Sequence, residues 1–293
     1  MEYKLLGSTK ERLSELGIGT WQLSRNREEN EKAINLALDS GVNFIDTAEI
    51  YGTENFVGKV IAGKRDLFIA TKVWATHFRY EAVIKSCDKS LKNLGIRQIG
   101  LYQLHWPNSG ISIKETMRAM EKLVYDGKIR YIGVSNFSKE ELKSALEAMS
   151  KYDIVSNQVE YNIIQRVPEM NLIDYMRKEK ITLLAYSPFA HGAIFRKRYR
   201  KLVGRIDLIG KNYGKTAGQM LLRWLMQKDI VIPLTKASNP QHMRENLAAA
   251  DFNINQKDMK IMDGLTPMNS NAGLSRFKGL IGGYVRLRSA LRF

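Results

Sequence analysis

Four polar side chains have the chemistry needed to deliver a proton to a carbonyl oxygen. They are Asp46, Tyr51, Lys72 and His105, and they lie in short polar motifs that each close an apolar, β-branched run. A tyrosine can donate the proton, but its pKa of about 10 in water makes it a poor acid near neutral pH unless positive charge favours the phenolate. Lys72 can supply that charge, with Asp46 holding the lysine ionised. His105 can add a directional hydrogen bond, so the four residues predict a site that reduces a carbonyl.

These residues can meet only if the fold gathers the ends of their strands. Apolar, β-rich runs separated by segments of helical period begin near Ser14, Val42, Leu67, Ile99, Ile129, Ile154, Ile181 and Ile230. Apart from the last, their starts lie roughly 25 to 32 residues apart, which is typical of repeated strand–helix units. A parallel barrel brings the carboxyl ends of its strands to one face. The sequence therefore predicts a (β/α)8 TIM barrel.

Helices are expected between these runs. The predicted ranges are Glu28–Ser40, Tyr80–Leu94, Lys114–Asp126, Lys139–Met149, Pro168–Glu179, Thr216–Gln227 and Pro240–Ala250. Their start signals include Ser138, Pro168 and Asn239. Glycines follow three of them, as is common after helix ends: Gly41, Gly95 and Gly127.

The 293 residues fit one such domain spanning 1–293, with the barrel over about 14–250. No linker or low-complexity tract divides the chain. Tyr3–Leu6 and Arg12–Leu16 are expected to pair as an N-terminal hairpin that plugs the bottom of the barrel. Pro188–Asn212 forms a long insertion after the seventh run. The C-terminal tail, about 266–293, is expected to lie over the barrel mouth.

The chain carries a net charge of +16, which favours anionic ligands such as nucleotides. Most of this charge is spread over predicted helix faces, whereas a nucleic-acid-binding protein would show a basic stripe, so no nucleic acid partner is expected. Two places are denser: residues 196–201, and the tail from Asn271, which has five basic residues and no acid. Residues 196–201 are either an exposed basic loop or a phosphate contact.

Several other functions lack their sequence signals. The segment Met1–Lys4 does not begin a secretory signal, and no apolar run approaches the roughly 20 residues of a membrane helix. We therefore expect a cytoplasmic protein with no membrane partner. Cys87 is the single cysteine and is expected to be a packing residue rather than a reactive thiol.

No metal site is expected either, since the four histidines lack the spacing of helical ligand pairs. They are His77, His105, His191 and His242. A Gly-x-Ser-x-Gly hydrolase elbow is also missing. Protein side chains cannot carry hydride, so a cofactor must supply it. Gly17-Ile18-Gly19 lacks the third glycine of a dinucleotide-binding turn, which disfavours a doubly wound fold.

Taken in order, eight sequence motifs resemble those of the aldo-keto reductases. They are Gly17–Gln22, Asp46–Gly52, Thr71–Trp74, Leu104–Pro107, Gly133–Phe137, Gln158, Tyr186–Pro188 and Lys236–Asn246. The resemblance implies a (β/α)8 barrel that binds NADPH or NADP+. It assigns Tyr51 as general acid, Lys72 and Asp46 as the pair that tunes it, and His105 as the residue that orients the substrate.

The resemblance also implies a cofactor site across the barrel mouth. Tyr186 would stack on the nicotinamide, and Ser135, Asn136 and Gln158 would bind its carboxamide. Lys236 and Ser238 match the family's 2′-phosphate contacts and favour NADPH over NADH. The full predicted set is Gly19, Thr20, Trp21, Asp46, Ser135, Asn136, Gln158, Tyr186, Ser187, Pro188, Leu234, Lys236, Ala237, Ser238, His242, Arg244, Glu245 and Asn246.

One position in the cofactor site departs from the family. Where many members have an arginine six residues after the lysine, this chain has His242, and Arg244 follows two residues later. Either side chain can contact the phosphate or the adenine. Glu245 and Asn246 match the adenine-binding end, although Arg244 and Glu245 can equally be exposed helix charges.

The predicted substrate site is aromatic. It consists of Trp21, Tyr51, Trp74, His105 and Trp106. Tryptophans favour apolar or aromatic aldehydes, although they also stack on sugar faces and often fill cores. Phe277, Tyr284 and Phe293 of the tail are candidates to complete the pocket.

The predicted function is NADPH-dependent reduction of an aldehyde or ketone carbonyl to an alcohol. Two alternatives remain open. The same site can run in reverse as an NADP+-dependent alcohol or aldose dehydrogenase, or the chain can be a non-enzymatic NADP(H)-binding regulatory subunit. The intact Asp46, Tyr51, Lys72 and His105 favour an enzyme. We expect a monomer or a weak homo-oligomer.

Overall fold

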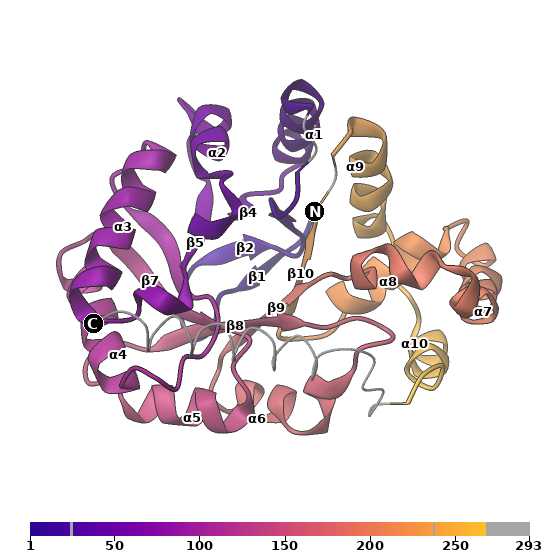
Figure 1. Cartoon of the computed structure of the whole chain (residues 1–293). Coiled ribbons are helices and arrows are strands. Elements are labelled where there is room, and N and C mark those ends of the chain that lie inside the picture. Colours follow the sequence, from indigo (N-terminus) through magenta and orange to yellow (C-terminus); the bar gives the residue numbers. More distant parts are fainter. Residues whose placement is uncertain (24–25, 237, 268–293) are drawn as a thin grey trace.

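A computed structural model of the chain describes residues 1–23, 26–236 and 238–267. Over these residues eight parallel strands close into a barrel surrounded by helices (Figure 1). The barrel strands are β3 (Gly17–Gly19), β4 (Phe44–Asp46), β5 (Phe68–Val73), β6 (Ile99–Leu104), β7 (Ile129–Ser135), β8 (Ile154–Glu160), β9 (Thr182–Tyr186) and β10 (Val231–Thr235). They follow chain order around the barrel, and β10 pairs with β3 to close it. The (β/α)8 prediction is confirmed, whereas the predicted tail over the mouth lies outside the described residues apart from its first two.

The helices lie around the outside of the barrel. They are α1 (Arg27–Asp39), α2 (Glu54–Ile61), α3 (Tyr80–Leu94), α4 (Ile113–Tyr125), α5 (Lys139–Glu147), α6 (Leu172–Lys178), α7 (Arg200–Lys211), α8 (Ala217–Met226), α9 (Pro240–Leu247) and α10 (Gln256–Asp263). Short 3-10 turns add η1 (Glu49–Tyr51), η2 (Ala75–His77), η3 (Val167–Met170), η4 (Ala190–Phe195), η5 (Lys197–Tyr199) and η6 (Ala248–Ala250). The seven predicted helices are present to within a few residues, except that Pro168 lies in η3 and α6 begins at Leu172. Helices α2, α7 and α10 were not predicted.

Local capping explains several of these boundaries. The Ser138 hydroxyl accepts a hydrogen bond from the Glu141 N–H, and the Glu141 carboxylate accepts one from the Ser138 N–H, which closes a capping box at the start of α5. Asn239 caps α9 by accepting from the His242 N–H. Gly95 ends α3 with φ of 66°, a left-handed conformation that glycine adopts without strain.

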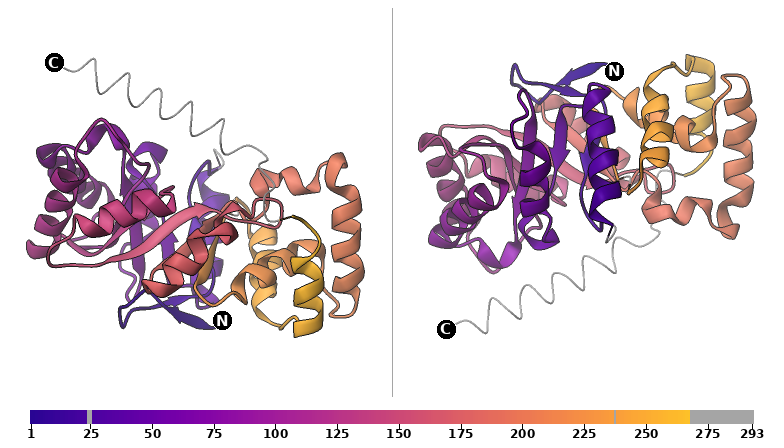
Figure 2. Two further views of the ribbon diagram at one scale, coloured as in Figure 1. Left: turned by 90° about the horizontal axis from the view of Figure 1, so that it is seen from below. Right: turned by 90° about the horizontal axis from the view of Figure 1, so that it is seen from above.

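An antiparallel hairpin of β1 (Tyr3–Leu5) and β2 (Arg12–Ser14) covers one end of the barrel (Figure 2). Leu6 and Leu13 are fully buried and pack into the same cluster as Phe44 and Phe68 of the barrel interior. The predicted hairpin plug is therefore confirmed. The first barrel strand begins at Gly17 rather than near Ser14, because Ser14 still pairs with Tyr3 in the hairpin.

The predicted insertion 188–212 is largely helical. It contains η4, η5 and α7, and α7 buries Ile206 and Gly210. Leu202, Val203 and Ile209 of α7 pack partly buried against the core, at the spacing of one helix face. The segment thus adds a second helix between β9 and β10 beside the predicted α8.

Candidate active site

A buried ion pair lies at the carboxyl ends of β4 and β5. Lys72 Nζ lies 2.5 Å from Asp46 Oδ1 and donates a second hydrogen bond to the backbone oxygen of Thr47 at 2.8 Å. The Lys72 side chain is 0 % exposed and that of Asp46 4 %. Burial lowers the pKa of Lys72, and Asp46 acts in the opposite direction. Because neither charge reaches water, each depends on the other and on its hydrogen-bond partners.

The hydroxyl of Tyr51 lies within 3.5 Å of both Lys72 and His105. The Tyr51 Oη lies 3.5 Å from Lys72 Nζ and 3.4 Å from His105 Nε2, and Lys72 Nζ lies 4.9 Å from the centre of the tyrosine ring. We expected Lys72 to lower the pKa of Tyr51. That expectation is wrong for this structure, because burial, followed by the charge of Asp46, raises the pKa well above its usual value. Tyr51 is therefore protonated at neutral pH and has a proton to donate.

His105 is neutral at this site. Burial, followed by the charge of Lys72, lowers the pKa of His105 well below its usual range. Within the described part of the chain, its Nδ1 is buried with no hydrogen-bond partner. The single N–H is better placed on Nε2, which faces the Tyr51 hydroxyl, since an orphaned N–H is rarer than an orphaned lone pair. Tyr51 Oη and His105 Nε2 lie 3.4 Å apart, so both can donate to one carbonyl oxygen bound beside them.

Asp46 has a second set of partners that includes a residue missed by the sequence analysis. Its Oδ2 accepts from Gln103 Nε2 at 3.1 Å and from Gln158 Nε2 at 2.9 Å, and all three side chains are buried. Gln103 lies on β6, two residues before His105, so both point into the barrel. That alternation was the signal available in the sequence, where Gln103 interrupts an otherwise apolar run.

The predicted nicotinamide contacts gather on β7, β8 and β9. Tyr186 Oη donates to Asn136 Oδ1 at 2.8 Å, and Asn136 Nδ2 donates to the His105 oxygen at 3.0 Å and to Ser135 Oγ at 3.1 Å. Asn136 takes a left-handed conformation with φ of 65°. No described residue donates to Gln158 Oε1, which leaves an acceptor for an amide N–H. These donors and acceptors fit the carboxamide of a nicotinamide.

The predicted phosphate contacts lie where β10 leads into α9, which packs beside α1 (Figure 1). The exposed Lys236 Nζ donates to the Gln22 backbone oxygen at 3.0 Å. His242 and Arg244 are exposed on α9, and His242 Nδ1 lies 3.3 Å from Glu245 Oε2. A cationic set next to a helix start fits a phosphate group. Leu234 and Asn246 are buried, Ser238 is half-buried, and Ala237 lies outside the described residues.

Thr20, a predicted cofactor contact, makes its hydrogen bonds to neighbouring protein groups in this structure. It is fully buried, and its hydroxyl lies 3.1 Å from both the Asp46 oxygen and Thr53 Oγ1. Its backbone N–H donates to the same Asp46 oxygen. In this structure Thr20 therefore supports the end of β4, and Gly19 pairs in register with Asp46 on the neighbouring strand.

The three predicted tryptophans have different surroundings. Trp74 is half-buried, with its ring edge-on to His105 at 5.3 Å, and Trp21 is 43 % exposed. Trp106 is mostly buried within the apolar core. The exposed Ile50, which precedes Tyr51, adds an apolar side chain that the sequence analysis did not name.

A further group gathers at the loop after β9. The His191 ring lies edge-on to Trp21 at 5.3 Å, and Ser187 Oγ lies 3.2 Å from His191 Nδ1. His191 Nε2 also lies 3.9 Å from Glu160 Oε1, a carboxyl whose pKa is raised by burial. The buried Pro188 follows Ser187. Ser187 and Trp21, both predicted cofactor contacts, thus both contact His191.

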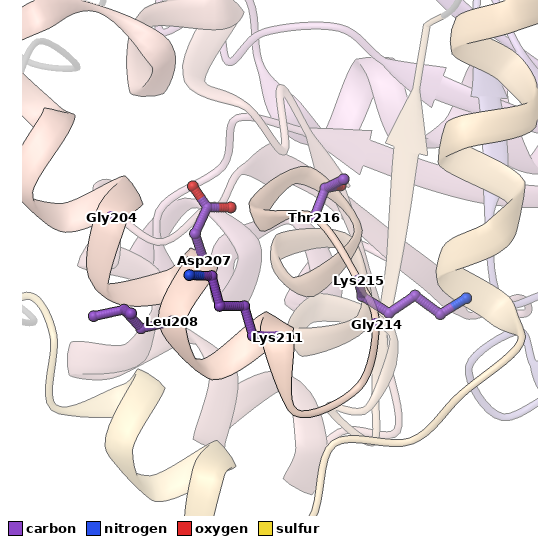
Figure 3. A pocket seen from close by; sticks show the side chains of 7 residues that line it. All are labelled: Gly204, Asp207, Leu208, Lys211, Gly214, Lys215 and Thr216. Carbon is purple, nitrogen blue, oxygen red and sulfur yellow. The ribbon is translucent and has the colours of Figure 1, made fainter.

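A separate cavity of about 670 Å³ lies between α7 and α8 (Figure 3). It is lined by Gly204, Asp207, Leu208, Lys211, Gly214, Lys215 and Thr216. None of these belongs to the predicted site, and Asp207 Oδ1 already accepts from the Ala217 N–H at the start of α8. Across the described residues, no cluster of three or more His, Cys, Asp or Glu could hold a metal ion. In the same residues, no helix is both long and apolar enough to cross a membrane.

The barrel thus carries a buried group of Asp46, Lys72, Tyr51 and His105 at the carboxyl ends of its strands. A family model described as the Aldo/keto reductase family matches residues 15–267. The chain belongs to this family and is an oxidoreductase of the aldo-keto reductase type.

Relatives and solved structures agree with this assignment. The chain is 34 % identical over 253 residues to glyoxal reductase from Bacillus subtilis, covering 85 % of this chain and 87 % of the relative. It is similar to the solved structure of the thermostable aldo-keto reductase Tm1743 with the inhibitor epalrestat, with 40 % identity, a TM-score of 0.84 and coverage of 90 % and 100 %. It is also similar to an aldo-keto reductase from Klebsiella pneumoniae in complex with NADPH, with 30 % identity, a TM-score of 0.84 and coverage of 92 % and 98 %.

Proposed function

We propose that this chain, as a single (β/α)8 domain, uses NADPH to reduce small aldehyde or ketone carbonyls to alcohols. The observation that carries the proposal is the convergence of Tyr51 Oη and His105 Nε2 beside the buried Lys72–Asp46 pair. Two donors directed at one position suit a carbonyl oxygen that gains negative charge as its carbon is reduced.

Each of the four residues has a distinct role in this proposal. Tyr51 donates its phenolic proton to the carbonyl oxygen, which becomes the alcohol hydroxyl, and the tyrosine is left as a phenolate. Lys72 stabilises that phenolate, because its ammonium lies 3.5 Å from the oxygen. Asp46 keeps Lys72 charged and in place, and neutral His105 donates a hydrogen bond that orients the carbonyl.

The residues present also fit a nicotinamide dinucleotide. Gln158 Oε1 offers an acceptor to the carboxamide, Tyr186 presents its ring, and Lys236 with Arg244 offers cations to the phosphates. When bound, NADPH supplies the hydride. A solved relative with 30 % identity is in complex with NADPH, which supports the same cofactor here.

Apolar side chains lie close to the two donors in space or in sequence. Trp74 packs edge-on to His105, Ile50 precedes Tyr51 and is exposed, and Trp21 is exposed after β3. A relative with 34 % identity is named glyoxal reductase, which supports small dicarbonyls such as glyoxal and methylglyoxal as the first substrates to test.

The test follows NADPH and NADH absorbance with glyoxal, methylglyoxal and an aromatic aldehyde, using Tyr51→Phe as the control variant. Among the described residues the hydroxyl makes only the two long contacts given above, so its removal should leave folding and NADPH affinity nearly unchanged. Turnover should fall by about 10² to 10⁴-fold, because the proton donor is lost. An unchanged kcat in Tyr51→Phe would overturn the assignment. Tight NADPH binding with no oxidation of NADPH in the presence of any of these substrates would instead support a regulatory subunit.

A further inference from the structure

One carboxylate outside the predicted site joins the turn that carries Tyr51 to the strand end that carries Lys72. Glu49 lies two residues before Tyr51 on η1. Its Oε1 accepts a hydrogen bond from the backbone N–H of Trp74, two residues after Lys72, and lies 3.0 Å from His77 Nδ1. The Glu49 side chain is 12 % exposed, so water competes little for these bonds.

The hydrogen bond between Glu49 and His77 requires a proton on one particular nitrogen of the His77 ring. A carboxylate oxygen accepts hydrogen bonds and cannot donate them, so the proton must be on His77 Nδ1. Ser86 Oγ lies 3.3 Å from the same nitrogen. Glu49 is thus held by two donors from the segment 74–77, one from the backbone and one from a side chain.

The turn needs such support because it has little of its own. Glu49 and Tyr51 are only partly enclosed by the core, and the residue that precedes the turn makes no side-chain cap hydrogen bond. Ile50, at its centre, is 51 % exposed. The Tyr51 N–H donates to the Ala48 oxygen, which lies within the turn itself, and the Thr47 N–H just before the turn donates to the Ala70 oxygen of β5.

The two segments joined by Glu49 both contact His105. The Tyr51 ring lies 5.4 Å from the His105 ring at an interplanar angle of 77°, and the Trp74 ring lies 5.3 Å away at 87°. The contacts of Tyr51 Oη with His105 and Lys72 are already near the outer limit of a hydrogen bond. A small shift of the turn would therefore break them.

We propose that Glu49 is a positioning residue that sets the distance of Tyr51 from Lys72 and His105 by holding η1 against the segment 74–77. The inference rests on the proposed reductase function. Glu49 does not touch the predicted substrate or cofactor positions in this arrangement. It acts through Tyr51 and Trp74.

The experiment compares Glu49→Ala and Glu49→Gln with the wild type, using NADPH and methylglyoxal. Glu49→Ala removes the acceptor, and kcat should fall roughly a hundredfold, the loss that follows from a displacement of about 1 Å at a reacting group. The dissociation constant for NADPH should stay within about twofold, since most of the predicted cofactor contacts lie on or after β3 and β7 to β10 rather than on η1 or the segment 74–77. Glu49→Gln keeps an acceptor oxygen for the Trp74 N–H and should recover most of kcat.

Glu121→Ala is the matched control. Glu121 Oε1 also accepts from backbone N–H groups, those of Ser150, Lys151 and Tyr152, but it joins α4 to the loop before β8. Its kcat should equal that of the wild type. The proposal is overturned if Glu49→Ala keeps its kcat, if Glu49→Gln loses as much as Glu49→Ala, or if the control loses as much as either.

A second readout does not depend on turnover. In the wild type, imidazole ¹⁵N shifts should show the Nδ1–H form of His77, and Glu49→Ala should lose that preference while Glu121→Ala keeps it. An unchanged His77 spectrum in Glu49→Ala would refute the bond on which the proposal depends. A wild type that consumes no NADPH yet shows the Nδ1–H form would instead refute the reductase function alone.

Discussion

The buried Lys72–Asp46 pair allows a prediction about the free energy of unfolding that can be tested without measuring activity. Lys72→Met removes one charge and leaves Asp46 buried with only Gln103 and Gln158 as donors. Asp46→Asn leaves the Lys72 ammonium buried, with the Thr47 oxygen as a strong acceptor. Removing one partner of a buried pair costs about 3 to 5 kcal/mol of unfolding free energy. Each single variant should lose that much.

The double variant Asp46→Asn/Lys72→Met should lose far less than the two losses added together, because no uncompensated charge remains buried. We expect a coupling free energy of about 3 kcal/mol. The measurement is urea unfolding of the four proteins, followed by far-ultraviolet circular dichroism, with midpoints and slopes compared. Losses that add to within about 0.5 kcal/mol would refute the reasoning, since they would mean that each charge is stabilised independently of the other. All three variants should also lose turnover. The two that carry Lys72→Met remove the charged neighbour of Tyr51, and Asp46→Asn removes the carboxylate that keeps Lys72 charged and in place.

Two further predictions concern the cofactor and the N-terminal hairpin. Lys236→Ala should weaken NADPH binding much more than NADH binding, because the exposed ammonium is placed to meet a 2′-phosphate. If a fluorescence titration showed equal losses of affinity for NADPH and NADH, Lys236 would not bind the 2′-phosphate. Burial lowers the pKa of Lys4 to about 8, and its Nζ donates to the Lys228 and Val231 oxygens. Between about pH 8 and 10.5 the unfolded chain therefore binds more protons than the folded protein. The unfolding free energy of the wild type, measured relative to that of Lys4→Met, should rise with pH across that window. The rise is at most about 1.4 kcal/mol per pH unit. A flat or falling difference in urea midpoints would show that Lys4 keeps its ordinary proton affinity.

The barrel could be predicted from the sequence because its signals are local and repeated. The apolar runs gave the strands, and capping residues such as Ser138 and Asn239 gave helix starts that the structure confirms. Helices α2, α7 and α10 were missed. In α7 the basic residues from Arg200 to Lys211 obscure an apolar face that becomes evident only when Ile206 is seen to be buried.

The residues of the site were predicted from the sequence, but the direction of the Tyr51 pKa shift was not. The four residues meet because the barrel gathers their strand ends, a consequence of topology alone. The direction of the Tyr51 pKa depends on how completely the hydroxyl is removed from water, which no pattern of residue types reports. Glu49 was visible within the segment Asp46–Gly52, but its role depends on which neighbouring segment its side chain reaches.

The pairing of Gly17 with Leu234 has a consequence for how the protein is made. Both partners must have left the ribosome before the ring of strands can close, and at typical rates of synthesis the second emerges roughly 10 to 40 s after the first. During that interval β3 is an open edge that another nascent chain could add to. It is three residues long and has glycine at both ends, which makes it a poor template for such an addition. The brevity of this strand therefore protects the protein during its own biosynthesis.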